Sequence, residues 1–90
     1  MSDVKVGTAV VPVNGRYGGR KMVAIEVCAG YAKICDGRRR RIGKPKRKKL
    51  CHLSVISPDA PRLEVNAGLT DGAVRRYLAS LPADANIPDD

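Results

Sequence analysis

Apolar residues gather in short runs separated by turn-forming residues, and this pattern predicts β-strands between residues 6 and 57. Residues 6–13 (VGTAVVPV) are rich in valine and lead into Asn14-Gly15, so they are predicted to form a strand that ends in a turn. Pro12 indicates an edge position or the end of that strand. Residues 50–57 (LCHLSVIS) form a later apolar run, which stops before Pro58 and predicts a further strand.

The most regular pattern lies between these runs and predicts a β-hairpin. Residues 21–29 (KMVAIEVCA) alternate with the period of a half-buried strand. Ala29-Gly30 can form a two-residue turn, and residues 31–36 (YAKICD) follow as the return strand. In this register the residues of each cross-strand pair share one face of the sheet, with Glu26 opposite Lys33, Ile25 opposite Ile34, Cys28 opposite Tyr31, and Cys35 opposite Ala24.

The remaining strand signals predict a mainly β fold. After a turn at Asp36-Gly37, residues 38–42 could form one more short strand, which Gly43 and Pro45 would interrupt. Four or five short strands joined by tight turns are typical of a small β-barrel. The chain has no Trp and no Phe, so its core must come from aliphatic side chains, and 90 residues suffice for one small domain.

A short helix is predicted near the C-terminal end, over residues 71–81. Thr70 or Asp71 can cap it. A helix of this length needs tertiary support, so its apolar stripe should dock on the barrel or on a partner. The sequence therefore predicts a barrel over residues 1–58 and an extension over residues 59–90, with a polar, acidic tail that frays from residue 82. The predicted apolar stripe consists of Val74, Tyr77, Leu78 and Leu81.

Positive charge is concentrated in the middle of the chain. Residues 38–49 (RRRRIGKPKRKK), here called the basic segment, carry nine positive charges and no negative one. The net charge is zero over residues 1–15, +11 over residues 16–49 and −3 over residues 50–90. A protein that neutralises several nucleic-acid phosphates gains binding free energy from counterion release, so a polyanion is the predicted partner.

Two other interpretations of the basic segment stay open. It could be a solvated loop that confers solubility, or a nuclear import signal, because PKRKK and RRRR fit that loose pattern. Nine like charges in twelve residues repel one another, however, and solubility alone does not require that cost. We therefore favour nucleic-acid binding.

The cysteines and the one histidine do not predict a metal site or a catalytic centre. Cys28, Cys35 and Cys51 lack the paired spacing of two to four residues that structural zinc sites use. The predicted hairpin also keeps Cys28 and Cys35 too far apart to share a disulfide or a metal. We expect three free thiols that act as buried small hydrophobes. His52 has no evident catalytic partner, so we expect no enzyme activity, no metal and no cofactor.

Several segments together resemble the KOW motif of RNA-binding and ribosomal proteins. The resemblance covers about residues 6–57, and its ordered combination is more specific than any one piece. The basic ending of the matched region, residues 44–53, is similar to the ending found in one branch of the family, the branch related to large-subunit ribosomal proteins of archaea and eukaryotes. Bacterial stand-alone KOW-domain RNA-binding proteins of similar length belong to that branch too. The segments are residues 7–11 (GTAVV), 15–20 (GRYGGR), 22–27 (MVAIEV), Asp36-Gly37 and residues 44–53 (KPKRKKLCHL).

The resemblance implies an SH3-like β-barrel that binds structured RNA. The RNA that it implies is ribosomal RNA of the large subunit, and ribosomal proteins could be further partners. A protein-interaction module of translation or transcription, with the helix as partner surface, and a duplex DNA binder are the alternatives. The nucleic-acid contacts that the resemblance implies are Arg16, Tyr17, Arg20 and Lys21 in the first loop, and Arg38, Arg39, Arg40, Arg41, Lys44, Lys46, Arg47, Lys48 and Lys49 in the basic segment. Tyr17 could stack on a base or cover the core.

The chain shows no signal-peptide pattern and no apolar run long enough for a transmembrane helix. An odd number of cysteines fits a reducing compartment. We expect a soluble protein in the cytoplasm, associated with ribosomes and not with a membrane.

Overall fold

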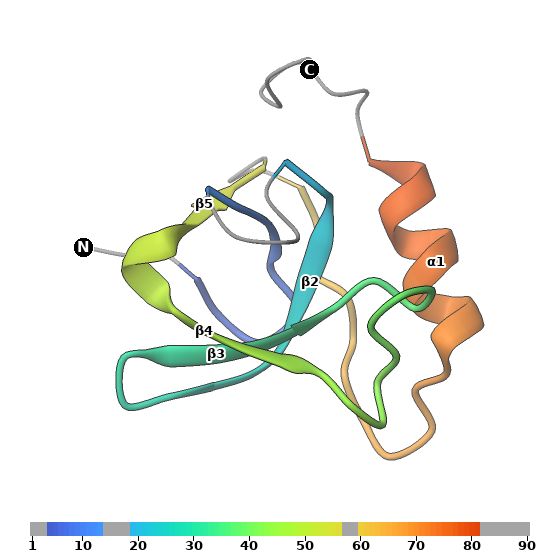
Figure 1. Ribbon diagram of the computed structural model, residues 1–90. Helices are drawn as coiled ribbons and strands as arrows, with labels where there is room; N and C mark the ends of the chain where they lie inside the picture. Colours follow the sequence, from blue (N-terminus) through green and yellow to red (C-terminus); the bar gives the residue numbers. More distant parts are fainter. Residues whose placement is uncertain (1–3, 14–18, 57–59, 82–90) are drawn as a thin grey trace.

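The computed structural model describes residues 4–13, 19–56 and 60–81. Five strands form one antiparallel sheet in the order β4-β3-β2-β1-β5 (Figure 1). The predicted fold class, mainly β with a short C-terminal helix, is confirmed. The elements are β1 (Ala9–Pro12), β2 (Met22–Cys28), β3 (Tyr31–Cys35), β4 (Lys46–Lys49), the 3₁₀ turn η1 (Leu50–His52), β5 (Leu53–Val55) and α1 (Asp71–Ser80).

The two edge strands of the sheet follow each other in the chain. β4 and β5 are joined by η1, and in the described residues they do not pair with each other, so the sheet is not closed. This topology is compatible with a small SH3-like barrel. Pro12 is the last residue of β1, which agrees with a strand end, but β1 lies between β2 and β5 and is not an edge strand.

The β2–β3 hairpin is confirmed, with a bulge that changes half of its predicted register. Glu26 pairs with Lys33 and Cys28 pairs with Tyr31, as predicted. The Glu26 carboxylate lies 3.7 Å from the Lys33 ammonium, and both side chains are about half exposed, so this pair contributes little to stability.

The predicted Ile25–Ile34 and Cys35–Ala24 pairs are wrong. Ile34 pairs with Ala24 and Cys35 pairs with Val23, because the register shifts between Ala24 and Glu26. A bulge places one extra residue, Ile25, on β2, and the residues before it move by one position relative to β3. Hydrophobic alternation continues through Ile25, so the sequence pattern does not reveal the bulge.

Two other predicted strands also differ. Residues 38–40 form bends and residues 41 and 42 form no strand. The strand of the basic segment is β4, whose backbone extends the hairpin by pairing with β3. The backbone amides of Asp36 and Gly37 both donate to the Arg40 carbonyl, which turns the chain back before a ladder can form. Leu50–His52 is a 3₁₀ turn, so the strand predicted over residues 50–57 is shortened to β5, Leu53–Val55.

The buried side chains form two hydrophobic clusters, one on each face of the sheet. Val10, Met22 and Ile34 belong to the cluster inside the curved sheet. Ala9, Val11 and Val23 belong to the second cluster, which α1 covers. Alternate residues of a strand point to opposite faces, so β1 is buried on both. This double burial explains why residues 9–12 (AVVP) are continuously apolar.

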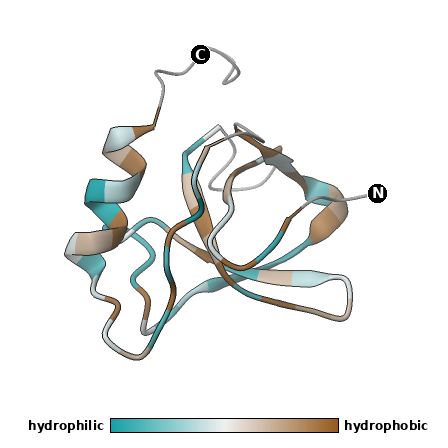
Figure 2. Ribbon diagram, turned by 180° about the vertical axis from the view of Figure 1, so that it is seen from behind, coloured by the Kyte–Doolittle hydropathy of each residue, from teal (hydrophilic) through white to brown (hydrophobic). Residues whose placement is uncertain are grey.

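The helix prediction is confirmed, and so is its docking on the sheet. The Thr70 hydroxyl accepts a hydrogen bond from the Ala73 amide at 3.1 Å and caps α1. Val74 and Leu78 are buried in the second cluster with Leu81, just after the helix. The helix carries hydrophobic and hydrophilic residues, as one buried and one exposed face require (Figure 2). The predicted acidic tail lies outside the described residues.

Cys35 should make the fold sensitive to alkaline pH. Burial in the second cluster, with the nearby carboxylates of Asp71 and Asp36, raises the pKa of its thiol from 9.0 to about 12. Between those values the unfolded chain releases the proton and the folded chain keeps it, so the free energy of unfolding falls as pH rises. The loss is on the order of 1 kcal/mol for each pH unit.

Urea unfolding of the wild type and of Cys35→Ala at mildly alkaline and strongly alkaline pH measures this term. Burial also raises the pKa of Tyr77, which adds a loss common to both proteins. We expect the wild type to lose more stability than the variant between the two pH values. Equal losses would show that Cys35 does not carry the effect.

Candidate nucleic-acid interface

The first half of the basic segment is a loop, and the buried carboxylate of Asp36 fixes its backbone. Asp36, at the end of the hairpin, is only 5% exposed. Its Oδ1 atom accepts hydrogen bonds from the backbone amides of Arg38 and Arg40, both at 2.9 Å. The Arg40 guanidinium also donates to the Lys44 carbonyl at 3.2 Å. The loop therefore has a defined path, which Asp36 and the Arg40 side chain hold.

The helix α1 holds the same loop from the other side. The Asp71 carboxylate, in the first turn of α1, accepts a hydrogen bond from the Ile42 amide at 2.8 Å. Arg75, one turn later, donates to the Gly37 carbonyl at 2.7 Å. Gly37 has φ +78°, and a Cβ there would lie 2.5 Å from the Asp71 carbonyl oxygen, so only glycine fits. The loop between β3 and β4 lies beside the start of α1 in Figure 1.

These contacts do not neutralise the exposed guanidinium groups of Arg38, Arg39 and Arg41. Both Asp36 Oδ1 and Asp71 Oδ1 accept from backbone amides of the loop and not from its guanidinium groups. Arg38, Arg39 and Arg41 are exposed and have no carboxylate partner among the described residues. The acids near the loop thus fix its shape and leave these arginines available to an external anion.

The second half of the basic segment is the edge strand β4. Lys46 and Lys48 pair with the core residues Ile34 and Ala32 and are half-buried, so their stems lie on the inner side of the sheet. Inward-pointing charges on an edge strand oppose edge-to-edge pairing with another chain. Lys46 and Lys48 therefore have a structural role besides any contact with a ligand.

The alternate residues of β4 point outward and meet an aromatic ring. Arg47 pairs with Lys33 and Lys49 pairs with Tyr31, so these four side chains share one face of the sheet. The Arg47 guanidinium lies 4.3 Å from the centre of the Tyr31 ring. The cations around this partly exposed ring can bind phosphate, and the ring or the Arg47 guanidinium can stack on an unpaired base. The sequence pattern did not single out Tyr31 or Lys33 as site residues.

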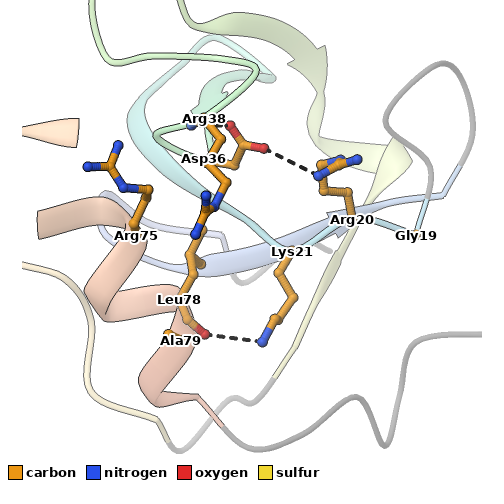
Figure 3. Close-up of a pocket in the computed structure, with 8 residues that line it drawn as sticks. All are labelled: Gly19, Arg20, Lys21, Asp36, Arg38, Arg75, Leu78 and Ala79. Carbon is orange, nitrogen blue, oxygen red and sulfur yellow. Dashed lines mark hydrogen bonds and ion pairs between the residues drawn. The ribbon is translucent and has the colours of Figure 1, made fainter. Parts of the chain in front are cut away.

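The first loop joins the site at its last two residues. Arg16 and Tyr17 lie outside the described residues. The Arg20 guanidinium lies 3.8 Å from Oδ2 of Asp36, and the Lys21 ammonium donates to the Leu78 carbonyl at 3.2 Å. Arg20 and Lys21 therefore lie beside the loop of the basic segment, where the resemblance implies contacts (Figure 3).

Arg75 of the helix completes this group, and sequence reasoning missed it. Arg20, Lys21, Arg38 and Arg75 line one cavity between the sheet and α1. Residues 75 and 76 are both arginines away from the apolar stripe, and the stripe gives no signal that distinguishes them. The one sequence feature that pointed to the helix was Gly37. A glycine can mark a place where another element comes close to the backbone, and here that element is α1.

The cysteines differ from the prediction in their exposure. Cys35 is buried as predicted, but Cys28 and Cys51 are exposed, so the expectation that all three are buried is wrong. Cys28 shares the outer face of the hairpin with Tyr31, and Cys51 lies in the 3₁₀ turn. All three thiols are free. Within residues 4–13, 19–56 and 60–81, no group of three or more His, Cys, Asp or Glu side chains could hold a metal ion.

The described part of the chain also contains no helix long and apolar enough to cross a membrane. No protein-family model matches the sequence, and no curated protein matches it.

Proposed function

We propose that this protein binds structured RNA without catalysis, as a KOW-type module that associates with ribosomal RNA of the large subunit. The observation that carries the proposal is the combination of a fixed backbone and free charge in the loop of the basic segment. Asp36 and Asp71 hold the backbone, while the guanidinium groups of Arg38, Arg39 and Arg41 face solvent.

A solubility loop would not need this arrangement. Fixing the backbone of one residue costs about 1–2 kcal/mol of conformational entropy, and a disordered basic tail would confer solubility without that cost. A fixed loop instead holds several guanidinium groups at set positions before the partner arrives. Pre-organisation of this kind increases affinity for a partner with regularly spaced anions.

The charge and shape of the site favour RNA over other partners. Arginine grips phosphate with two parallel hydrogen bonds and stacks on unpaired bases. Tyr31 lies among Lys33, Arg47 and Lys49 and offers a ring on which an unpaired base can stack. Phosphate contacts carry no base information, so we expect low sequence specificity and a strong dependence on salt.

The protein-docking alternative would have to use the face of α1 that the sheet leaves exposed. The apolar stripe of α1 is buried against the sheet, so it is not available to a partner. The exposed surface of the site is cationic instead. If the proposal is correct, the protein is cytoplasmic and ribosome-associated.

Sedimentation of a cell lysate through a density gradient at moderate salt tests the proposal. We expect the protein to migrate with large ribosomal subunits, and to move to light fractions after nuclease treatment or in high salt. A light position that nuclease does not change would contradict RNA binding and favour the docking module. Preference for duplex DNA over folded RNA at equal ionic strength would favour the DNA-binding alternative.

A further inference from the structure

A cavity of about 340 Å³ lies between the sheet and the C-terminal half of α1. Arg20 and Lys21 lie on one side of it, and Arg75 and Leu78 of the helix lie on the other (Figure 3). Its volume corresponds to about ten water molecules, which is ample for a tetrahedral anion with ordered water.

The wall of the cavity is strongly positive. Four cationic side chains and one carboxylate, that of Asp36, line it among the described residues, so its formal charge is +3. Three different parts of the chain supply these cations: the segment before β2, the loop after β3, and the helix. Hydrogen bonds to backbone carbonyls orient the Lys21 and Arg75 side chains, and the Gly37 carbonyl does not neutralise the Arg75 guanidinium.

The one acid in the wall has an unmet hydrogen-bonding need. Oδ2 of Asp36 is buried and has no hydrogen-bond partner in the described part of the chain. The Arg20 guanidinium faces it, but at 3.8 Å the contact is an ion pair and not a hydrogen bond. A guanidinium has five N–H donors, so Arg20 could donate to Oδ2 and to an oxyanion at the same time.

We propose that this cavity holds one backbone phosphate of the bound RNA. Arg38 and Arg20 donate to the phosphate oxygens, Lys21 and Arg75 supply further positive charge, and Arg20 bridges the phosphate and Asp36. This inference rests on the proposed function and extends it, because it assigns a contact to Arg75 and to the helix. A phosphate held here would fix the position of the RNA strand relative to the sheet face that carries Tyr31 and Arg47.

Arg38→Gln and Arg39→Gln form a matched pair that tests the proposal. Both arginines are exposed residues of the same loop, and both variants lose one charge, but only Arg38 lines the cavity. The Arg38 contact with Asp36 uses the backbone amide, which glutamine keeps, so the loop should keep its path.

Anisotropy of a labelled RNA stem-loop, titrated with each protein over a salt series, gives the affinities. We expect Arg38→Gln to weaken binding about tenfold to a hundredfold, because a charge-assisted hydrogen bond to the phosphate is lost. Arg39→Gln should cost about twofold to threefold, as a screened surface charge does. Amide spectra of both variants must match the wild type.

The outcomes separate the two proposals. Equal losses from Arg38→Gln and Arg39→Gln, with strong binding by the wild type, would overturn the cavity site and leave RNA binding intact. An absence of measurable wild-type binding at every salt concentration would overturn both.

The helix offers a second matched pair of residues, Arg75 and Arg76, which can be compared in the wild-type protein. Arg75 lines the cavity and Arg76 does not, although both are exposed residues of the same helix. Titration of the wild type with inorganic phosphate, followed by NMR, should move the guanidinium signals of Arg38 and Arg75 more than those of Arg39 and Arg76. Equal shifts of all four would contradict a specific phosphate site.

Discussion

A variant in which Arg38, Arg39 and Arg41 are all replaced by glutamine is expected to bind RNA at least about tenfold more weakly than the wild type. Each lost phosphate contact should also flatten the plot of log affinity against log salt by about 0.7–0.9, or about two to three for the three residues together. Arg40 is kept because its guanidinium bonds to the Lys44 carbonyl and supports the loop. Anisotropy titrations at several salt concentrations measure both quantities.

The control for this variant changes the same net charge elsewhere. Lys5, Arg62 and Arg76 are exposed cations outside the basic segment, and their replacement by glutamine also removes three positive charges. If the control triple weakened RNA binding and flattened the salt dependence as much as the loop triple, general charge would explain the binding. The interface assigned to the basic segment would then be incorrect.

Replacing Gly37 with alanine is expected to destabilise the fold by about 2–4 kcal/mol. The left-handed backbone conformation at φ +78° accounts for about 1–2 kcal/mol of this loss. The rest arises because the new Cβ would meet the Asp71 carbonyl at 2.5 Å and the Arg75 side chain at 3.0 Å. Urea unfolding, followed by circular dichroism, measures the change.

Two other glycines separate the causes. Gly30 also has positive φ, +84°, but a Cβ there would meet nothing within 4 Å, so Gly30→Ala should show the backbone term alone. Gly43 lies in the same loop as Gly37, with open space around it and no positive φ, so Gly43→Ala should change stability little. If Gly37→Ala cost no more than Gly30→Ala, the contact between loop and helix would be looser than described.

Local patterns predicted the hairpin and the helix well because their determinants are near in sequence. The Ala29-Gly30 turn and the Glu26–Lys33 pair define one register, and Thr70 caps α1 within one turn. The bulge at Ile25 was not predictable in this way. The bulge brings Val23 and Cys35 opposite each other in the cluster under the helix. Their pairing depends on packing against α1, which is distant in the sequence.

The candidate site was predicted in composition but not in arrangement. Charge density identified the basic segment, yet a run of like charges has little strand propensity, and β4 forms because its backbone pairs with β3. The roles of Asp36, Asp71 and Arg75 depend on contacts between distant segments, which the sequence does not display. RNA binding and the KOW resemblance stay predictions until binding is measured.

The position of α1 at the end of the described chain has a consequence for synthesis. The cluster beneath it cannot be completed until Val74, Leu78 and Leu81 have left the ribosome. At about 5–20 residues per second, the interval from Ile56 to Leu81 lasts on the order of seconds. During that interval the apolar outer face of β1 and β2 is uncovered on the nascent chain. The second cluster should therefore form only after the helix has been synthesised, and a chain stalled before residue 74 should be a target for chaperones.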